Sequence, residues 1–102
     1  MDINGYQEWT RDFDQERNDW CLTLGLVGEA GEFAEKIKKK YRATPLLPEP
    51  RELAKELGDV LWYLARLADL YGFTMTQVMA LNVDKLESRR KRGVLQGEGD
   101  NR

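Results

Sequence analysis

Residues 51–72 read RELAKELGDVLWYLARLADLYG, and this stretch decides the fold. Apolar residues recur in it at intervals of three and four from Leu53 to Tyr71, which is the period of an amphipathic helix. Gly72 then marks the end of the predicted helix. Because the apolar stripe runs along one face only, the helix must bury that face against another element.

The same spacing extends through the rest of the chain. It predicts helices over residues 3–14 and 19–41. Thr74-Met75-Thr76-Gln77 has the pattern of a capping box, so a fourth helix is expected to begin there and to end near Gly93. Its inward-facing residues are expected to be Met75, Met79, Val83 and Leu86. No run alternates with period 2, so we predict an all-α, four-helix bundle-like domain.

The three prolines, Pro45, Pro48 and Pro50, mark a loop near residues 42–50. Neither half of the chain could bury a core alone, so residues 1–93 are predicted to form one domain. Residues 94–102 are glycine-rich with almost no apolar anchor, and are expected to be a flexible tail unless a ligand orders them.

The composition of the chain limits the kinds of partner that it is expected to bind. The chain has 102 residues and a net charge of −2, which argues against nucleic-acid binding by bulk charge. No apolar run approaches the ~20 residues needed to cross a bilayer, and the start MDINGYQEW lacks the features of a secretory signal. The single cysteine, Cys21, favours a cytoplasmic location. A chain of this size buries only roughly 60–65% of its unfolded surface, which favours oligomerisation through the helices.

The chain contains no histidine. This excludes Ser-His-Asp and Cys-His nucleophilic sites, His-ligated zinc and Glu-x-x-His di-iron bundles. Any metal site must therefore use oxygen ligands, which favour magnesium, manganese or calcium.

Two pairs of acidic residues lie on two successive predicted helices, each spaced i, i+3 so that both carboxylates share one helix face. The pairs are Glu29 with Glu32, and Glu56 with Asp59. In both helices the acids flank the apolar stripe on the same side. An antiparallel packing of the two stripes would bring four carboxylates together, as a hard-cation site that could clamp a polyphosphate. Acid pairs on solvated helix faces are the alternative reading.

Glycines surround these acids inside the predicted helices, at Gly25, Gly28, Gly31 and Gly58. Each interior glycine costs ~1 kcal/mol relative to alanine. Their presence indicates close approach by a ligand or simply by another helix.

A basic row follows on the fourth helix, where Asn82, Lys85 and Arg89 share one face. These groups suit phosphate oxygens, although basic residues also favour a solvated helix C-terminus. Lys36 and Lys39 share the flank of the first acid pair, so one of them could reach a phosphate.

In this order the residues resemble the MazG-like nucleoside triphosphate pyrophosphohydrolases of the all-α pyrophosphatase superfamily. That signature is an E-x-x-E pair followed one helix later by E-x-x-D, here EAGE at 29–32 and ELGD at 56–59. The flanks GLVGEAGEFAE and ELAKELGDVLWYL and the basic row also match. The resemblance covers roughly residues 5–93.

The resemblance implies hydrolysis of (deoxy)nucleoside triphosphates between the α and β phosphates, to monophosphate and pyrophosphate, with Mg²⁺ or Mn²⁺ as a substitute. It implies a homodimer or homotetramer with the site near a subunit interface. By position it implies metal ligands at Glu29, Glu32, Glu56 and Asp59, and phosphate ligands at Asn82, Lys85 and Arg89. Glu29 is the first candidate to orient or deprotonate the attacking water, and Glu32 the second.

Aromatic residues are candidates for stacking on the base. Trp20, at the start of the helix that carries the first acid pair, is the main one, whereas Phe13 and Trp9 are expected to pack in the core. Trp62 points away from its own apolar stripe, toward a partner surface or the first helix. The alternative to an enzyme is a non-catalytic helical oligomer that binds nucleotide or a protein partner.

Overall fold

The computed structural model describes residues 1–15, 18–42, 48–94, 96–97 and 99. In these ranges the chain forms four α-helices and one 3-10 turn, with no strand. The elements are α1 (Ile3–Thr10), η1 (Arg11–Phe13), α2 (Asp19–Lys39), α3 (Pro50–Leu70) and α4 (Met75–Lys91). The all-α prediction is confirmed, and no helix in the described part of the chain is long and apolar enough to cross a membrane.

Local chemistry explains where the helices begin. The Asn18 side chain accepts a hydrogen bond from the Cys21 N–H at 2.8 Å and caps α2. Pro50 opens α3, where its missing N–H is not needed. The predicted capping box at Thr74 and Gln77 is present at the start of α4.

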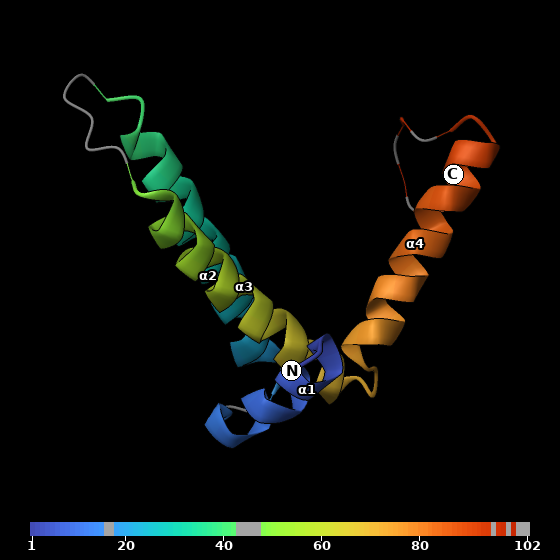
Figure 1. Cartoon of the computed structure of the whole chain (residues 1–102), viewed down its shortest axis with the longest axis horizontal. Coiled ribbons are helices and arrows are strands. Elements are labelled where there is room, and N and C mark those ends of the chain that lie inside the picture. Colours follow the sequence, from blue (N-terminus) through green and yellow to red (C-terminus); the bar gives the residue numbers. More distant parts are fainter. Residues whose placement is uncertain (16–17, 43–47, 95, 98, 100–102) are drawn as a thin grey trace.

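The helices form a V rather than a closed bundle (Figure 1). Helices α2 and α3 pack side by side as one arm, α4 forms the other arm, and α1 lies at the vertex, where it contacts both α3 and α4. The radius of gyration is 16.6 Å, whereas a compact chain of this length would have about 13 Å. The open arrangement determines which of the predicted site residues meet within one chain.

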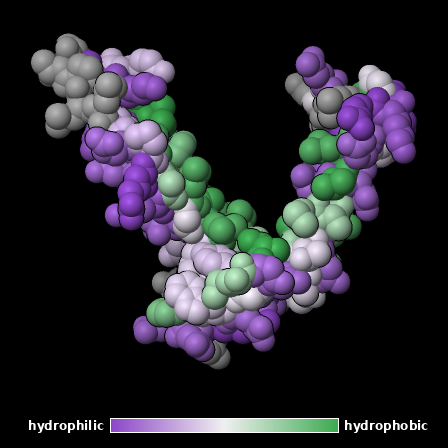
Figure 2. All heavy atoms as spheres, viewed as in Figure 1, coloured by the Kyte–Doolittle hydropathy of each residue, from purple (hydrophilic) through white to green (hydrophobic). Residues whose placement is uncertain are grey.

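The predicted inward face of α4 is buried only at its start. Met75 is 8% exposed, but the side chains that follow, Met79, Val83 and Leu86, are all exposed. The prediction that these three residues pack inside the same chain is therefore wrong, because α4 leaves the α2–α3 pair after its first turn. Figure 2 shows apolar side chains along the inner edges of both arms.

The core is small and lies near the vertex. Ala65, Ala68 and Met75 form its buried cluster, with Ile3, Tyr6 and Leu61 packed against it. The expectation that Trp9 and Phe13 pack in the core is wrong, since they are 46% and 54% exposed.

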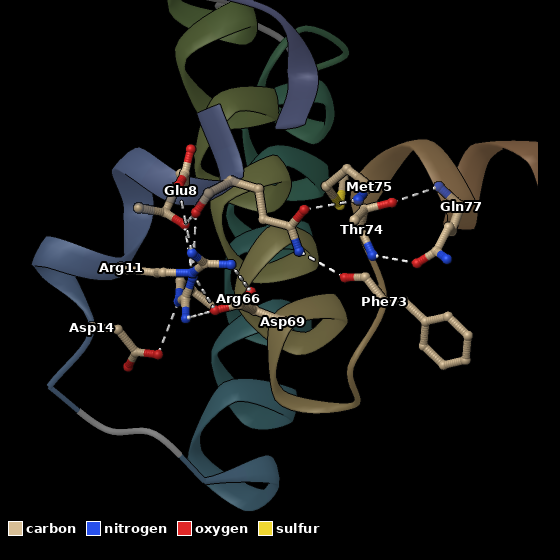
Figure 3. A network of polar contacts seen from close by, with 11 residues as sticks. Glu8, Arg11, Asp14, Arg66, Asp69, Phe73, Thr74, Met75 and Gln77 are labelled. Atoms are coloured by element: carbon tan, nitrogen blue, oxygen red, sulfur yellow. Dashed lines mark hydrogen bonds and ion pairs between the residues drawn. The ribbon is translucent and has the colours of Figure 1, made fainter. Parts of the chain in front are cut away.

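The buried face of the first segment is polar instead, and a single buried cation explains why. Arg66 is 6% exposed and donates to Asp14 at 2.9 Å, to Asp69 at 2.7 Å and to the Thr10 hydroxyl at 3.0 Å (Figure 3). A buried guanidinium requires such partners, because an unpaired buried charge is strongly destabilising. The network therefore anchors α1 and η1 to α3.

A second polar contact joins α1 to α4. The buried Gln7 amide donates to the Phe73 carbonyl and accepts from the Met75 N–H, each at 2.8 Å (Figure 3). Asn4 accepts from the Thr76 N–H at 3.0 Å. These bonds hold the first turn of α4 against α1 and so constrain the direction in which α4 leaves.

The two predicted irregular segments are only partly described. Residues 43–47 of the proline loop lie outside the described residues, as do five residues of the predicted tail. Within the described part of the tail, the Gly99 carbonyl accepts a hydrogen bond from Arg89 at 3.3 Å.

Candidate metal centre

Three carboxylates converge where α2 packs against α3. One oxygen each of Glu29, Glu32 and Glu56 lies within 4.8 Å of the others. The sequence predicted that four carboxylates converge here; the packing of α2 on α3 brings three of them together, and Asp59 is not one of the three. Oxygen donors so close together suit a hard divalent cation.

Two oxygens of this cluster are buried. Glu29 Oε2 and Glu56 Oε2 are inaccessible to solvent and lack a hydrogen-bond partner among the described residues. Buried polar atoms are almost always satisfied, and a buried anion without a partner is costly. These two atoms therefore fit a bound cation that would satisfy both.

The electrostatics of the cluster act on Glu29. Burial raises the pKa of Glu29 above its ordinary value, and the neighbouring charges of Glu32, Asp59 and Glu56 raise it further. A carboxylate with a raised pKa holds a proton more firmly, which is the property of a general base that works near neutral pH.

Asp59 lies at the edge of the cluster and is exposed. It is not among the three carboxylates with mutually close oxygens, but its charge acts on both Glu29 and Tyr6. The pKa of Tyr6 is raised by burial and then by Asp59. Tyr6 of α1 therefore lies within electrostatic range of the fourth predicted ligand.

One lysine contacts the cluster. Lys36 Nζ lies 3.5 Å from Glu56 Oε1, with side-chain exposures of 33% and 15%. The sequence singled out Lys36 as a candidate phosphate ligand, whereas in the structure it pairs with a predicted metal ligand on the facing helix.

The glycines near the acids have two different environments. A Cβ at Gly25 would lie 2.2 Å from the Tyr63 ring, so this glycine permits close packing of α2 on α3. At Gly28, Gly31 and Gly58 a Cβ would meet no described atom within 4 Å. Helix packing within the chain therefore explains Gly25 and leaves the other three unexplained.

The basic row is not brought to the acids within one chain. It lies on α4, whose later turns point away from α2 and α3 (Figure 1). Asn82 and Lys85 are exposed and line a hollow of about 560 Å³ with Phe73, Val78 and Leu81. Arg89 is 4% exposed and is engaged with Gly99.

The aromatic candidates lie at the vertex end. Trp20 is 71% exposed, at the second residue of α2, about 13 Å along the helix axis from Glu29. The rings of Tyr6, Trp9 and Phe13 form a ladder, with centroid distances of 5.8 and 4.6 Å.

Gln7 and Arg66, which position α1 and α4, were not predicted from the sequence. The signal was present in the first predicted helix, residues 3–14, where Gln7, Thr10 and Asp14 follow one another at intervals of three and four. These polar residues form one face of the helix, beside the face that carries Trp9 and Phe13, and both faces have the helical period. Hydrophobicity alone therefore predicted that the aromatic face is buried, whereas in the structure the polar face is.

Comparison with known proteins gives a family match over residues 18–94, to the MazG nucleotide pyrophosphohydrolase domain. The Gene 37 protein of Mycobacterium phage L5 is 50% identical over 84 residues, which cover 79% of this chain and 74% of the phage protein. The protein YvdC of Bacillus subtilis (strain 168) is 28% identical over 103 residues, covering 87% and 96% of the two chains.

A third relative carries an activity in its name. The dCTP pyrophosphatase 1 of Rattus norvegicus is 36% identical over 87 residues, which cover 80% of this chain and 49% of the rat protein. The chain thus matches about half the length of that enzyme. No solved structure matches the chain.

Proposed function

Because the chain belongs to the MazG nucleotide pyrophosphohydrolase family, we propose that it hydrolyses nucleoside triphosphates between the α and β phosphates, releasing a monophosphate and pyrophosphate, with Mg²⁺ as cofactor. The observation that carries this proposal is the convergence of Glu29, Glu32 and Glu56, with two buried oxygens that a cation would satisfy. Mn²⁺, which also takes oxygen ligands, can substitute.

The four acids divide into two roles. Glu29, Glu32, Glu56 and Asp59 hold the metal, which when bound would neutralise phosphate oxygens and make a water more acidic. Glu29, with its raised pKa, takes the proton of the attacking water as the new P–O bond forms and the bridging P–O bond breaks. Glu32, whose negative charge acts on Glu29 from the next turn of α2, orients it and is the second candidate base.

A second copy of the chain completes the site. The chain exposes 7853 Å², whereas a compact monomer of its mass would expose about 5,900 Å². Apolar side chains along the inner edges of the V remain to be covered (Figure 2). We therefore expect a homodimer or homotetramer in which Asn82, Lys85 and Arg89 of one copy hold the phosphates at the acids of another.

The base is expected to stack on exposed aromatic rings. Trp20 is the candidate on α2. Trp9 and Phe13 are further candidates, because both are exposed and belong to the same aromatic ladder as Tyr6. Tyr6 itself lies within electrostatic range of Asp59. Stacking of this kind gains ~1–3 kcal/mol with any base. The name of the rat relative makes dCTP the first substrate to test.

The test is turnover of a panel of dNTPs and NTPs with Mg²⁺ or with EDTA. We expect monophosphate and pyrophosphate only with Mg²⁺. Glu29→Gln and Asp59→Asn should abolish turnover without changing the helical content, while Glu35→Gln, an exposed acid on the same helix, should not affect it. Orthophosphate as the sole product, or undiminished turnover in EDTA, would contradict the proposal. Nucleotide binding without turnover or metal dependence would favour the non-catalytic oligomer.

A further inference from the structure

The ion pair between α2 and α3 links the acid cluster to a cation of the chain itself. Lys36 lies one helical turn beyond Glu32 on α2 and reaches across to Glu56 on α3, with 3.5 Å between Nζ and Oε1. Residues four apart on a helix share a face, so Lys36 is directed to the same side as the acid pair.

Charge balance gives this contact a consequence. Three carboxylates with mutually close oxygens repel one another, and Asp59 adds a fourth negative charge nearby. The ammonium of Lys36 offsets one of these charges at Glu56, one of the two acids that also contribute a buried, unpartnered oxygen. A divalent cation that binds Glu56 must therefore compete with an ammonium already close to that carboxylate.

The chemistry of lysine suits a counter-ion that another cation can displace from a carboxylate. Its ammonium is a point charge on a flexible stem, without the planar fork by which arginine binds a carboxylate in two places. Lys36 is one-third exposed, so its side chain has a route from Glu56 to solvent.

We propose that Lys36 is a resident counter-ion of the metal centre: it pairs with Glu56 in the metal-free protein and is displaced from Glu56 when a divalent cation binds. This inference rests on the proposed function, because it takes Glu56 as a metal ligand. If Lys36 were a metal ligand or a purely structural residue, its removal would weaken metal binding or leave it unchanged. Removal of a counter-ion should instead strengthen metal binding.

The experiment measures binding of Mn²⁺ alone, without nucleotide, by electron paramagnetic resonance at physiological salt. We expect Lys36→Met to bind Mn²⁺ about two- to fivefold more tightly than the wild type, the range set by a partly exposed ion pair. Lys38→Met is the matched control, because it removes the same charge from an exposed position on the same helix. Lys38→Met and Lys36→Arg should both bind Mn²⁺ no more tightly than the wild type.

Thermal unfolding supplies a second readout. Without metal, Lys36→Met should melt below the wild type, because the carboxylates lose their counter-ion. Saturating Mn²⁺ should narrow that difference, because the cation then takes over the role of the lysine. Lys36→Gln repeats both measurements if the methionine variant folds poorly.

The outcomes separate the two proposals. If the wild type binds Mn²⁺ and Glu29→Gln does not, the metal site stands and the Lys36 variants alone decide the inference. The inference would be overturned if Lys36→Met bound Mn²⁺ no more tightly than the wild type, or if Lys36→Arg bound Mn²⁺ as tightly as Lys36→Met does. If the wild type binds no Mn²⁺, both the metal-dependent function and the counter-ion role fail.

Discussion

The ring of Tyr63 occupies the space that a side chain at Gly25 would need. A Cβ at this position would lie 2.2 Å from Tyr63 Cε1 and 2.4 Å from Cζ. The contact joins α2 to α3 one helical turn before Glu29, so it helps to set the spacing of the two helices that carry the acids.

We expect Gly25→Ala to destabilise the fold by about 1–3 kcal/mol, because overpacking a close helix contact forces the backbone or the ring to move. Gly28→Ala is the matched control on the same helix. No described atom lies within 4 Å of its Cβ, so it should raise stability by up to about 1 kcal/mol through helix propensity. Chemical denaturation measures both. Equal effects of the two substitutions would contradict the close contact.

Gln7 connects α1 to both sides of the α3–α4 joint. Gln7→Leu removes two hydrogen bonds of 2.8 Å and leaves the Phe73 carbonyl and the Met75 N–H without those partners. We expect a loss of about 2 kcal/mol or more, and faster hydrogen exchange at the Met75 amide. Gln15→Leu, at an exposed position, should change neither. Unaltered exchange at Met75 would show that Gln7 does not hold α4.

The protonation of Asp69 makes the folded protein less stable at acid pH. The hydrogen bond from Arg11 lowers the pKa of Asp69 from 3.8 to about 2, with help from Arg66 and against the effect of burial. A depressed folded-state pKa stabilises the protein above pH 4, and this contribution is lost as the pH falls from about 4 to 2. Its size is at most about 2 kcal/mol, because the Arg11 side chain is 50% exposed and solvent screens its charge. In Asp69→Asn the stability lost over that interval should be smaller by this amount, whereas Asp12→Asn should behave like the wild type. If Asp69→Asn lost as much stability over that pH interval as the wild type, Asp69 would not be the source of the effect.

The exposed apolar residues of α4 predict self-association. Sedimentation should give the mass of a dimer or tetramer for the wild type. Met79→Lys and Val83→Asp should shift it toward the monomer and reduce turnover, because a charge would have to be buried at the contact. Gln15→Lys adds the same charge as Met79→Lys at an exposed residue outside α4, and should leave the assembly intact. A monomeric wild type with full activity would contradict the two-copy site.

The sequence by itself determined the helices and the acid pairs. Apolar spacing, the capping box at Thr74 and the prolines before α3 are local signals, so the helix bounds agree closely with those in the structure. The convergence of Glu29, Glu32 and Glu56 was predictable because it needs only two amphipathic helices packed face to face.

Only the tertiary structure decided how the remaining elements lie around that pair. The buried face of α1 was mispredicted because Arg66, far along the chain, requires polar partners that hydrophobicity does not identify. The departure of α4 depends on the bonds of Gln7 to the α3–α4 joint, which no local pattern encodes. The apolar residues of α4 indicate that this helix must be covered, but they do not indicate whether the same chain or a second copy covers it. The hydrophobic effect is non-directional, so its driving force is the same in both cases.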